Sequence, residues 1–405
     1  MEFKNFGFED TLMEGINAMG YEKATPVQIK AIPLILDGKD LIGSAQTGTG
    51  KTAAFLLPII NNLLVTNAND HHIKALVIVP TRELAIQIDQ QMEGFSYFTN
   101  VSSIAVFGGG DGSSFDREKK ALTTGADVVI ATPGRLIAHL NMKYVQVNEL
   151  NCLVLDEADR MLDMGFYEDI MKIISFLPKK RQNLMFSATM PPKIRTLAKT
   201  VLQNPEEINI AISKPAENIL QIAFVVYNNQ KIPLVDYLFQ SKKLERVLIF
   251  CARKSSAKVL SKELKKLGML VEDIHSDLDQ NTRIEVLNNF KNKKLNALVA
   301  TDILSRGIDI EDIELIINYD VPNDGEDYIH RIGRTARAAS KGAAFTFINE
   351  EEQYQFSEIE AMLGKPVPKA KLPESVGQGP AYNPIKRPKV KSGRNKFSKG
   401  RKPGK

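Results

Sequence analysis

The sequence predicts an α/β protein with two tandem parallel-sheet domains and a disordered basic C-terminal tail. Short runs of Val, Ile and Leu alternate with segments of helical periodicity, which is typical of parallel strands covered by helices on both faces. The series stops at a polar, proline-containing stretch, residues 203–224, and then begins again. A final segment, residues 366–405, contains seven prolines and few apolar residues.

The elements can be placed in chain order. A strand, a glycine-containing loop and a helix start are expected within residues 40–58, and a helix at 81–92, where apolar residues recur at every fourth position. The other strands expected in the first domain are 75–80, 127–133, 152–155 and 183–189. Those expected in the second domain are 246–253, 295–302, 314–320 and 343–348. The expected division is domain 1 at 1–210, a linker at 211–220, domain 2 at 221–365 and the tail at 366–405.

Composition places the chain among soluble globular proteins. A length of 405 residues, with 43% hydrophobic and 25% charged residues, suits two domains. No apolar stretch approaches the roughly 18 residues that cross a membrane, and the first ten residues lack a secretory pattern. Cys152 and Cys251 lie in apolar runs, which predicts buried thiols in a reducing compartment. We therefore expect a cytoplasmic protein without membrane contact.

The net charge of +5 is unevenly distributed. Residues 366–405 hold 12 Lys/Arg and one acid, whereas residues 1–365 hold 41 basic and 47 acidic residues. The low apolar content predicts that the tail is disordered, and an unstructured polycation favours a polyanionic partner. The alternative is a tail that only keeps the chain soluble.

The loop within residues 40–58 has the composition of a phosphate-binding site. AQTGTGKT has the spacing of the phosphate loop, with Ala45 where the general pattern has glycine. Its two glycines let the backbone turn N–H groups toward phosphate oxygens at a helix N-terminus. Lys51 would reach the β- and γ-phosphates, and the Thr52 hydroxyl would bind Mg²⁺. The candidate ATP-binding residues are Ala45, Gln46, Thr47, Gly48, Thr49, Gly50, Lys51 and Thr52. An ordinary glycine-rich turn is the alternative.

Three carboxylates follow the apolar run 153–155. Asp156, Glu157 and Asp159 stand at the end of an expected buried strand, where unpaired charges are costly. A Mg²⁺ ion held between the nucleotide and Asp156 would supply positive charge, and Glu157 would orient and deprotonate an attacking water. A solvated acidic loop does not explain acids at the end of an apolar strand. The pattern predicts ATP hydrolysis.

These residues closely resemble the DEAD-box ATP-dependent RNA helicases of superfamily 2, a family named for Asp156-Glu157-Ala158-Asp159 as they stand here. The resemblance covers residues 1–365 and implies two RecA-like domains that close over ATP, Mg²⁺ and RNA. GYEKATPVQ is similar to the Q motif, which implies that Gln28 contacts the adenine edge. Phe3 and Tyr21 are candidates to pack near the base, although without the family they would be interpreted as core.

Further motifs match the RNA contacts that the family makes with its first domain. PTRELA, a glycine pair and TPGR supply hydroxyls, backbone N–H groups and guanidiniums, which are all phosphate ligands. The RNA-binding residues expected there are Thr81, Arg82, Gly108, Gly109, Thr132 and Arg135. SAT, with Ser187 and Thr189, is similar to the motif that links hydrolysis to strand separation, and Asp159 is expected to take part in this coupling.

The second domain carries QNTR, ATDILSRGIDI and HRIGRTAR. In the last of these, Arg331, Arg334 and Arg337 recur at helical spacing, which predicts a cationic stripe; a salt-bridged helix face is the alternative. By resemblance, Arg334 and Arg337 are arginine fingers on the γ-phosphate. The resemblance also implies that Asp309 contacts the ribose. It implies that Thr301 and Arg306 contact RNA or the interface between the domains. His330 is expected to couple the two sites.

The sequence departs from the family pattern at a few positions. Small residues replace the usual proline, glycine or alanine at Ala24, Ser276, Ser305 and Ala336. Arg253 stands where a hydroxyl residue is common, which leaves RNA contact there open. The basic tail and the segment 299–310 are most similar to the bacterial RhlE-type group.

The resemblance implies RNA-stimulated ATP hydrolysis that locally unwinds short duplexes without sequence specificity. We expect a monomer whose partner is RNA and whose tail is a basic RNA tether; protein partners stay open. Two alternatives are a DNA-directed superfamily 2 translocase and an RNA clamp that turns over only with a partner. The Q motif and the DEAD tetrad argue against the first alternative.

Overall fold

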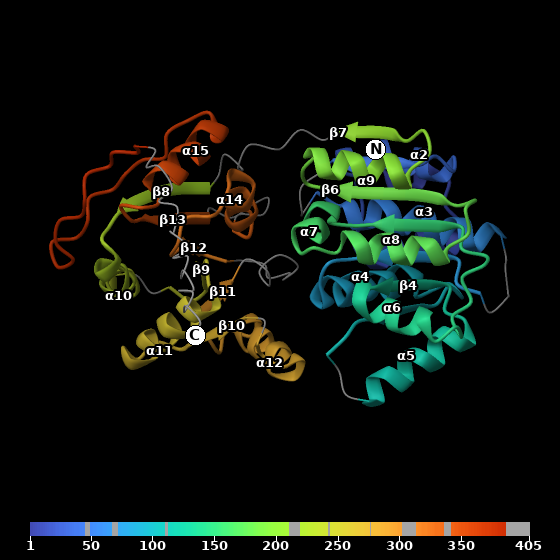
Figure 1. Ribbon diagram of the computed structural model, residues 1–405, viewed down its shortest axis with the longest axis horizontal. Helices are drawn as coiled ribbons and strands as arrows, with labels where there is room; N and C mark the ends of the chain where they lie inside the picture. Colours follow the sequence, from blue (N-terminus) through green and yellow to red (C-terminus); the bar gives the residue numbers. More distant parts are fainter. Residues whose placement is uncertain are drawn as a thin grey trace, which may run out of the picture.

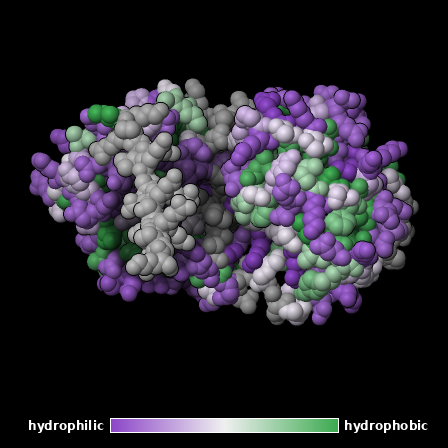
Figure 2. Space-filling view, in the orientation of Figure 1, coloured by the Kyte–Doolittle hydropathy of each residue, from purple (hydrophilic) through white to green (hydrophobic). Residues whose placement is uncertain are grey.

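The protein consists of two parallel β-sheets in tandem, each covered by helices on both faces (Figure 1). The computed structural model describes residues 1–44, 49–66, 72–109, 112–209, 219–241, 244–275, 277–301, 313–335 and 342–385. Every strand pair within the two sheets is parallel, which confirms the predicted α/β class. In the part of the chain that is described, no helix is long and apolar enough to span a membrane. Hydrophilic residues cover most of the face in Figure 2, and apolar residues form scattered groups.

The first sheet has the strand order β3-β4-β2-β5-β6-β1-β7. Its strands are β1 (Leu41–Ser44), β2 (Ala75–Ile78), β3 (Ser103–Val106), β4 (Val128–Ala131), β5 (Cys152–Leu155), β6 (Gln182–Ser187) and β7 (Glu206–Asn209). Helices α1 (Asp10–Ala18), α2 (Pro26–Leu36), α3 (Lys51–Thr66) and α4 (Arg82–Ser96) pack on one face, after a short η1 (Phe3–Phe6). The other face packs on α5 (Gly112–Thr124), α6 (Pro133–Asn141), α7 (Ala158–Asp163), α8 (Tyr167–Phe176) and α9 (Pro192–Val201). Because both faces are buried, a strand such as β2 is apolar throughout.

The second sheet has the order β10-β11-β9-β12-β13-β8. Its strands are β8 (Ile219–Val225), β9 (Val247–Cys251), β10 (Val271–Ile274), β11 (Ala297–Thr301), β12 (Leu315–Asn318) and β13 (Gly342–Ile348). One face packs on α12 (Gln280–Lys291), α14 (Gly325–Ile332) and α15 (Gln353–Leu363). The other packs on α10 (Lys231–Ser241), which follows η2 (Asn228–Gln230), and on α11 (Lys254–Lys266). Residues 211–218 of the expected linker lie outside the described residues. Its last two residues, 219 and 220, are the first two residues of β8.

The strand order of the first sheet gathers three of the predicted motifs at one edge. Strands β5, β6 and β1 are neighbours, and all run in the same direction. The loops that follow their carboxyl ends therefore lie side by side, at the edge where α/β sheets bind ligands. The loop after β1 leads to Lys51, the loop after β5 begins with Asp156, and β6 ends at Ser187.

Residues 366–385 pack against the second domain, which corrects the expectation of disorder for the first half of the predicted tail. We call this segment the C-terminal strap; Figure 1 draws it in red. The N–H of Ala223 donates to the carbonyl of Pro368 (2.8 Å), and the N–H of Ala370 donates to the carbonyl of Ala223 (2.9 Å). The strap thus supplies hydrogen bonds to the edge strand β8. Residues 386–405, the rest of the tail, lie outside the described residues.

Side chains of α15 fix the strap in place. Glu360 accepts hydrogen bonds from the N–H of Val367 (2.6 Å) and the hydroxyl of Tyr382 (2.7 Å), and it forms an ion pair with Lys369. The Lys369 ammonium lies over the rings of Tyr382 and Phe356, at 4.3 and 5.4 Å from their centroids. Average composition did not indicate this order, because it does not show that Val367, Leu372 and Val376 are placed against the core of the domain.

Candidate active site

The phosphate loop joins β1 to α3. Ala45, Gln46, Thr47 and Gly48 lie outside the described residues, whereas Thr49 and Gly50 are described. Gly50 has φ +88°, and a Cβ atom there would lie 2.5 Å from Nε2 of Gln28, so the position requires glycine. Lys51 is 6% exposed, and its buried Nζ has no hydrogen-bond partner among the described residues. A buried ammonium in this state favours an anionic ligand.

Gln28 connects the Q motif to the phosphate loop. Its Oε1 accepts the N–H of Thr25 (2.8 Å) in the capping box of α2, and its Nε2 donates to the carbonyl of Gly50 (3.1 Å). The carboxamide oxygen and nitrogen each keep capacity for one more hydrogen bond. Contact between Gln28 and an adenine base stays a prediction.

Phe3 and Tyr21 belong to an aromatic cluster of the first domain. Phe3 is 2% exposed, and the centroid of the Tyr21 ring lies 5.9 Å from that of Phe3 and 5.1 Å from that of Phe95. Both residues also line a cavity of about 370 Å³. Their surroundings fit the alternative of core packing, and the contact with the base stays a prediction.

Asp156 is a buried carboxylate at the end of β5. It is 3% exposed, and its Oδ1 accepts the N–H of Glu157 (2.9 Å). Burial raises the pKa of Asp156 to about 6, against the opposing effect of Lys51. A carboxylate destabilised in this way gains strongly from a nearby cation. Together with the Thr52 hydroxyl it offers the oxygen ligands that Mg²⁺ prefers, so these residues fit the ion.

Glu157 has a strained backbone and a tightly held side chain. Its φ of 50° and ψ of 49° lie in the left-handed region, which is uncommon for a non-glycine residue and costs free energy that a functional site can justify. Its Oε2 accepts a hydrogen bond from Nη1 of Arg160 at 3.0 Å. Burial acts to raise the pKa of Glu157, but Arg160, Lys51 and Arg334 outweigh it, and the pKa lies below its usual value. Because Arg334 belongs to the second domain, this carboxylate is influenced by charge from both domains.

Asp159 links the DEAD tetrad to the SAT motif. Its Oδ2 accepts the N–H of Thr189 at 3.1 Å, and the Ser187 hydroxyl donates to the carbonyl of Thr189 at 2.7 Å. A shift of the loop after β5 would therefore be transmitted to the loop after β6.

The RNA-binding residues predicted in the first domain gather around Arg82. Thr81 caps α4 by accepting a backbone N–H at 3.3 Å. Gly109 has φ +91°, and a Cβ atom there would lie 2.0 Å from Nη1 of Arg82. The pKa of Arg82 is lowered by burial and by the cations Arg283 and Arg135. Such a concentration of positive charge favours a polyanion.

Three further residues complete this group. Gly108 precedes Gly109, and space is open around its Cα. Thr132 is the N-cap residue of α6, but its hydroxyl makes no capping hydrogen bond. Nε of Arg135 donates to Glu118 at 2.6 Å, and its buried Nη2 has no partner among the described residues. The Thr132 hydroxyl and the Arg135 guanidinium thus keep donors for a ligand.

In the second domain, the described site residues lie at the end of β11 and around α14. Thr301 is the last residue of β11 and is buried, His330 lies in the last turn of α14, and Arg334 follows that helix. The predicted residues Arg306, Asp309 and Arg337 lie outside the described residues. Their roles stay predictions.

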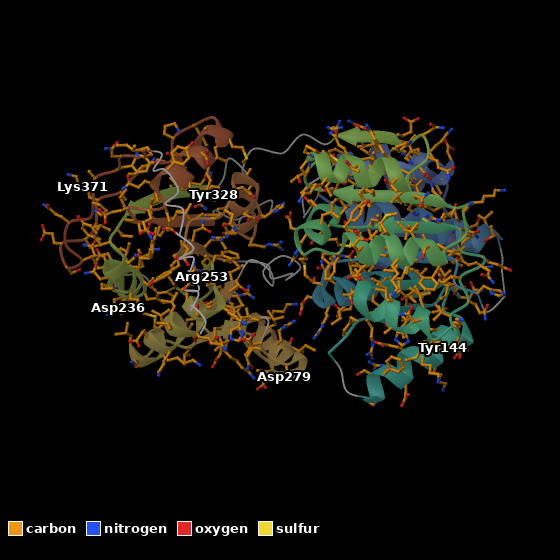
Figure 3. All side chains as sticks on the ribbon, in the orientation of Figure 1. Tyr144, Asp236, Arg253, Asp279, Tyr328 and Lys371 are labelled. Atoms are coloured by element: carbon orange, nitrogen blue, oxygen red, sulfur yellow. The ribbon has the colours of Figure 1, made fainter. Side chains whose placement is uncertain are left out.

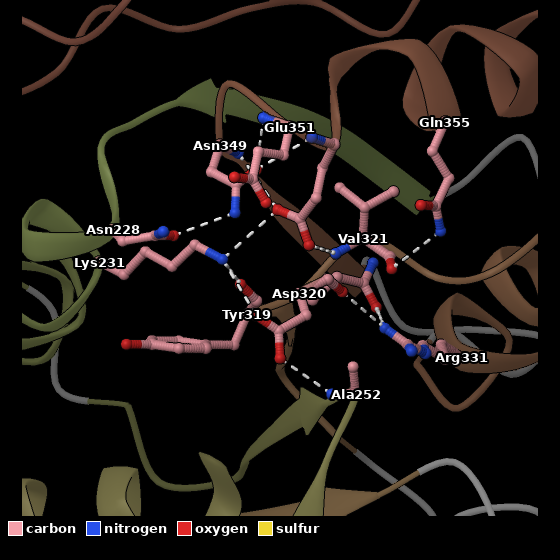
Figure 4. A network of polar contacts seen from close by, with 12 residues as sticks. Asn228, Lys231, Ala252, Tyr319, Asp320, Val321, Arg331, Asn349, Glu351 and Gln355 are labelled. Atoms are coloured by element: carbon pink, nitrogen blue, oxygen red, sulfur yellow. Dashed lines mark hydrogen bonds and ion pairs between the residues drawn. The ribbon is translucent and has the colours of Figure 1, made fainter. Parts of the chain in front are cut away.

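Arg331 does not belong to a cationic stripe, so the stripe prediction was wrong for this residue. Helix α14 ends at Ile332, and Arg334 therefore lies beyond it. Arg331 is 3% exposed; its Nη1 donates to the carbonyl of Asp320 at 2.9 Å and to Oδ1 of Asn318 at 3.2 Å (Figure 4). Its role is to attach α14 to the end of β12.

The same close-up shows what holds Asp320. Nζ of the buried Lys231 lies 3.1 Å from Oδ1 of Asp320 and 3.5 Å from Oε2 of Glu352, and it donates to the carbonyl of Tyr319 at 2.7 Å (Figure 4). Oδ2 of Asp320 accepts the N–H of Ala252 at 2.9 Å. Asp320, whose carbonyl accepts the hydrogen bond from Arg331, is thereby held between the end of β12 and the end of β9, and α14 is attached to both strands through it.

An ion pair between the domains was missed by the sequence analysis. Nη1 of Arg283, on α12, lies 2.5 Å from Oε1 of Glu83, on α4, and both side chains are buried. Both residues stand inside motifs that the sequence analysis quoted. Their opposite charges were the available signal, but nothing in one sequence indicated that the two motifs face each other.

The phosphate loop and the acidic residues belong to the first sheet, and Arg334 comes from the second. This distribution is typical of nucleoside triphosphatases built from two RecA-like domains, in which an arginine completes a site formed by the other domain. The fold and the site define this class.

Comparison with known proteins specifies the family. Residues 25–197 match the DEAD/DEAH box helicase model, and residues 230–339 match the helicase conserved C-terminal domain. The DEAD-box ATP-dependent RNA helicase CshA of Geobacillus kaustophilus is 40% identical over 92% of this chain and 78% of its own length. The chain belongs to the DEAD-box ATP-dependent RNA helicases and is an RNA-stimulated ATPase.

Other relatives carry the same name. CshA of Bacillus subtilis is 39% identical over 92% of this chain and 74% of its own length. CshA of Listeria monocytogenes is 42% identical, over 87% of this chain and 66% of the Listeria protein. Because these relatives are CshA proteins, the comparison does not support the RhlE-type grouping expected from the sequence.

Solved structures agree with the fold. Yeast Dbp5 bound to RNA and ADP BeF3 superposes with a TM-score of 0.81 at 30% identity, over 91% of this chain and 95% of that chain. Mss116p bound to ssRNA and AMP-PNP superposes with a TM-score of 0.81 at 29% identity, over 92% of this chain and 80% of that chain. A DEAD box protein from Methanococcus jannaschii superposes with a TM-score of 0.53 at 36% identity, over 92% of this chain and 99% of that chain.

Proposed function

We propose that this helicase hydrolyses ATP between its two domains while both domains hold the RNA backbone. Lys51, Thr52 and Asp156 would bind the phosphates and Mg²⁺, which neutralises phosphate charge when bound. Glu157 orients the attacking water and accepts its proton, and Arg334 and Arg337 stabilise charge on the transferred phosphoryl group. The observation that carries the proposal is the ion pair between Glu83 of domain 1 and Arg283 of domain 2, which holds the domains together, and the charge of Arg334 in domain 2 also contributes to the lowered pKa of Glu157.

The proposed RNA surface consists of backbone-binding groups from both domains. The groups are Thr81, Arg82, Gly108, Gly109, Thr132 and Arg135 of the first domain and Thr301 and Arg306 of the second. Hydroxyls, glycine N–H groups and guanidiniums contact phosphate and sugar and do not distinguish bases, so low sequence specificity follows. A strand bent across both domains cannot stay paired, and a short duplex melts locally. Asp159, Ser187, Thr189 and His330 transmit closure between the two sites.

The relative placement of the two domains supports closure around both ligands. The superpositions on Dbp5 and on the Methanococcus jannaschii protein cover nearly the same share of this chain. The TM-score is nevertheless 0.81 for Dbp5 bound to RNA and ADP BeF3 and only 0.53 for the Methanococcus jannaschii protein, although the latter is more similar in sequence. The difference therefore reflects domain arrangement more than divergence. The buried pair Glu83–Arg283 would stabilise the same arrangement. We further propose a cytoplasmic monomer.

ATP turnover is expected to be low for the protein alone and to rise strongly with single-stranded RNA, because closure requires both ligands. The measurement is steady-state phosphate release against RNA concentration, with DNA of the same sequence as the control. The 2′-hydroxyl is the group by which the protein would distinguish the two. Equal stimulation by DNA would contradict the RNA assignment. Absence of stimulation by either would favour the partner-gated clamp.

We also propose that residues 386–405 are a basic RNA tether. They contain ten Lys/Arg and no acid, whereas residues 1–365 are net negative. The C-terminal strap shortens this tether to 20 residues and starts it from a fixed place on domain 2. A tether of this kind raises the local RNA concentration near the active site.

Truncation after Ile385 is expected to raise the RNA concentration that gives half-maximal stimulation and to leave RNA-saturated turnover unchanged. If about five cations contact phosphates, the slope of log K against log salt shrinks by about 3–4. A full-length chain with these ten cations replaced by glutamine is the matched control for length. Truncation after Lys365 should also lower the Tm, by about 5 °C or more, because it removes the strap. Unchanged affinity and slope after truncation at Ile385 would leave the tail with only a solubilising role.

A further inference from the structure

Glu118, on α5, lies where two RNA-facing loops of the first domain meet. Its side chain is 5% exposed, and its two oxygens serve different partners. Oε1 accepts the N–H of Phe107, the residue before the Gly108-Gly109 pair, at 3.3 Å. Oε2 accepts Nε of Arg135 at 2.6 Å and lies 2.9 Å from Nε2 of His139. One carboxylate therefore joins the glycine loop to the TPGR helix.

The surroundings restrict the Arg135 side chain further. Its Cζ lies 4.5 Å from the centroid of the Phe115 ring, and this ring stacks on His139 at 4.4 Å and 14°. Nδ1 of His139 hydrogen-bonds to the hydroxyl of Tyr144, which lies beside α5 and α6 in Figure 3. With Nε held by Glu118, the buried Nη2 is the donor that stays without a partner among the described residues.

We propose that Glu118 is a positioning residue for RNA, which holds the glycine loop and the Arg135 guanidinium in their RNA-binding geometry before RNA arrives. The proposal rests on the proposed function, because it takes Arg135 and Gly108-Gly109 as phosphate contacts. An arginine that is already immobilised loses less conformational freedom on binding. The negative charge of Glu118 by itself would repel phosphates, so a positional role accounts for an acid at this surface.

Glu118 can affect RNA binding through its position and through its negative charge, and these two possibilities predict opposite effects of Glu118→Gln on RNA affinity. A carboxamide has one accepting oxygen, and its NH₂ group would face another donor, so one of the two loops is released. The RNA concentration for half-maximal stimulation is then expected to rise about three- to tenfold. Loss of negative charge alone would lower it. Turnover at saturating RNA and the KM for ATP should not change, because the ATP site is untouched.

Two matched variants separate position from charge. Asp116→Asn removes the same charge from an exposed residue of the same helix and should bind RNA as tightly as the parent or more tightly. Glu118→Asp keeps the charge but is one methylene shorter, so it cannot reach both partners and should weaken RNA binding. In an Arg135→Ala background, Glu118→Gln should cost less than it does alone, because part of its effect acts through Arg135.

The measurements are RNA-dependent ATPase activity, direct RNA titration and the Tm of each variant. If Glu118→Gln and Glu118→Asp bind RNA as tightly as the parent, or lower only the Tm, the positioning role is wrong and the proposed function stands. If the parent itself shows no RNA stimulation, the proposed function fails and this proposal fails with it.

Discussion

Replacing Glu157 by glutamine is expected to reduce ATP turnover by about 10²–10⁴-fold, the usual contribution of a general base. Binding of ATP and RNA should persist, because proton abstraction stabilises only the transition state. The amide oxygen can still accept the hydrogen bond from Arg160, so the local structure should be kept. The measurement is single-turnover hydrolysis together with titrations of ATP and RNA.

Glu168→Gln is the matched control for this experiment. Glu168 is an exposed acid in the first turn of α8, and the same substitution there should leave turnover unchanged. If Glu157→Gln hydrolyses ATP at the parental rate, Glu157 is not the base. If it also loses ATP binding, the side chain supports the nucleotide site itself.

The position of Glu157 could be predicted because sequence and sheet topology act together there. A continuous apolar run indicates a strand buried on both faces, and polar residues at its carboxyl end must lie at the ligand edge of the sheet. Lys51 could be placed opposite them because the phosphate-loop pattern follows another such strand. The left-handed backbone of Glu157 and its bond to Arg160 could not be predicted, because both depend on the conformation of one loop.

The arginine motif shows where spacing fails. Residues three apart share a face only while the helix continues, and α14 ends at Ile332, directly before Gly333. That glycine was the available signal, because glycine is a poor helix former. The partners of Arg331 were beyond prediction, since Asn318 and Asp320 come from the end of a strand and not from helical positions near it.

The C-terminal strap shows the limit of composition. Averaged over residues 366–405, the segment has too few apolar residues to form a core of its own, and this favoured disorder. It needs no core of its own, however, because Val367 is buried in the second domain and Leu372 and Val376 pack against a core already formed. The edge strand β8 adds hydrogen bonds that do not depend on sequence. The charge distribution does change at residue 386, where the run of cations without acids begins.

Replacing Arg334 by alanine is expected to reduce RNA-stimulated turnover by about 10³-fold or more, the usual effect of losing an arginine finger. The Tm should change little, because Arg334 lies beyond the end of α14 and acts on charge at the other domain. Arg337→Ala is expected to behave in the same way. The measurement is kcat at saturating ATP and RNA together with the Tm of the same preparation.

Arg331→Ala is the contrasting variant. It removes a cation from the same motif, but this cation attaches α14 to the end of β12 and does not act on the phosphate. Its hydrogen bonds to Asn318 and to the carbonyl of Asp320 contribute about 1.5–3 kcal/mol each, as is usual for bonds to a charged group. Its loss should therefore lower the Tm, while turnover per folded molecule falls far less than in Arg334→Ala. If Arg334→Ala lowers the Tm and keeps its turnover, the finger role is wrong and Arg334, like Arg331, is structural. If Arg331→Ala loses turnover as severely as Arg334→Ala at an unchanged Tm, attachment of α14 to β12 is itself required for catalysis.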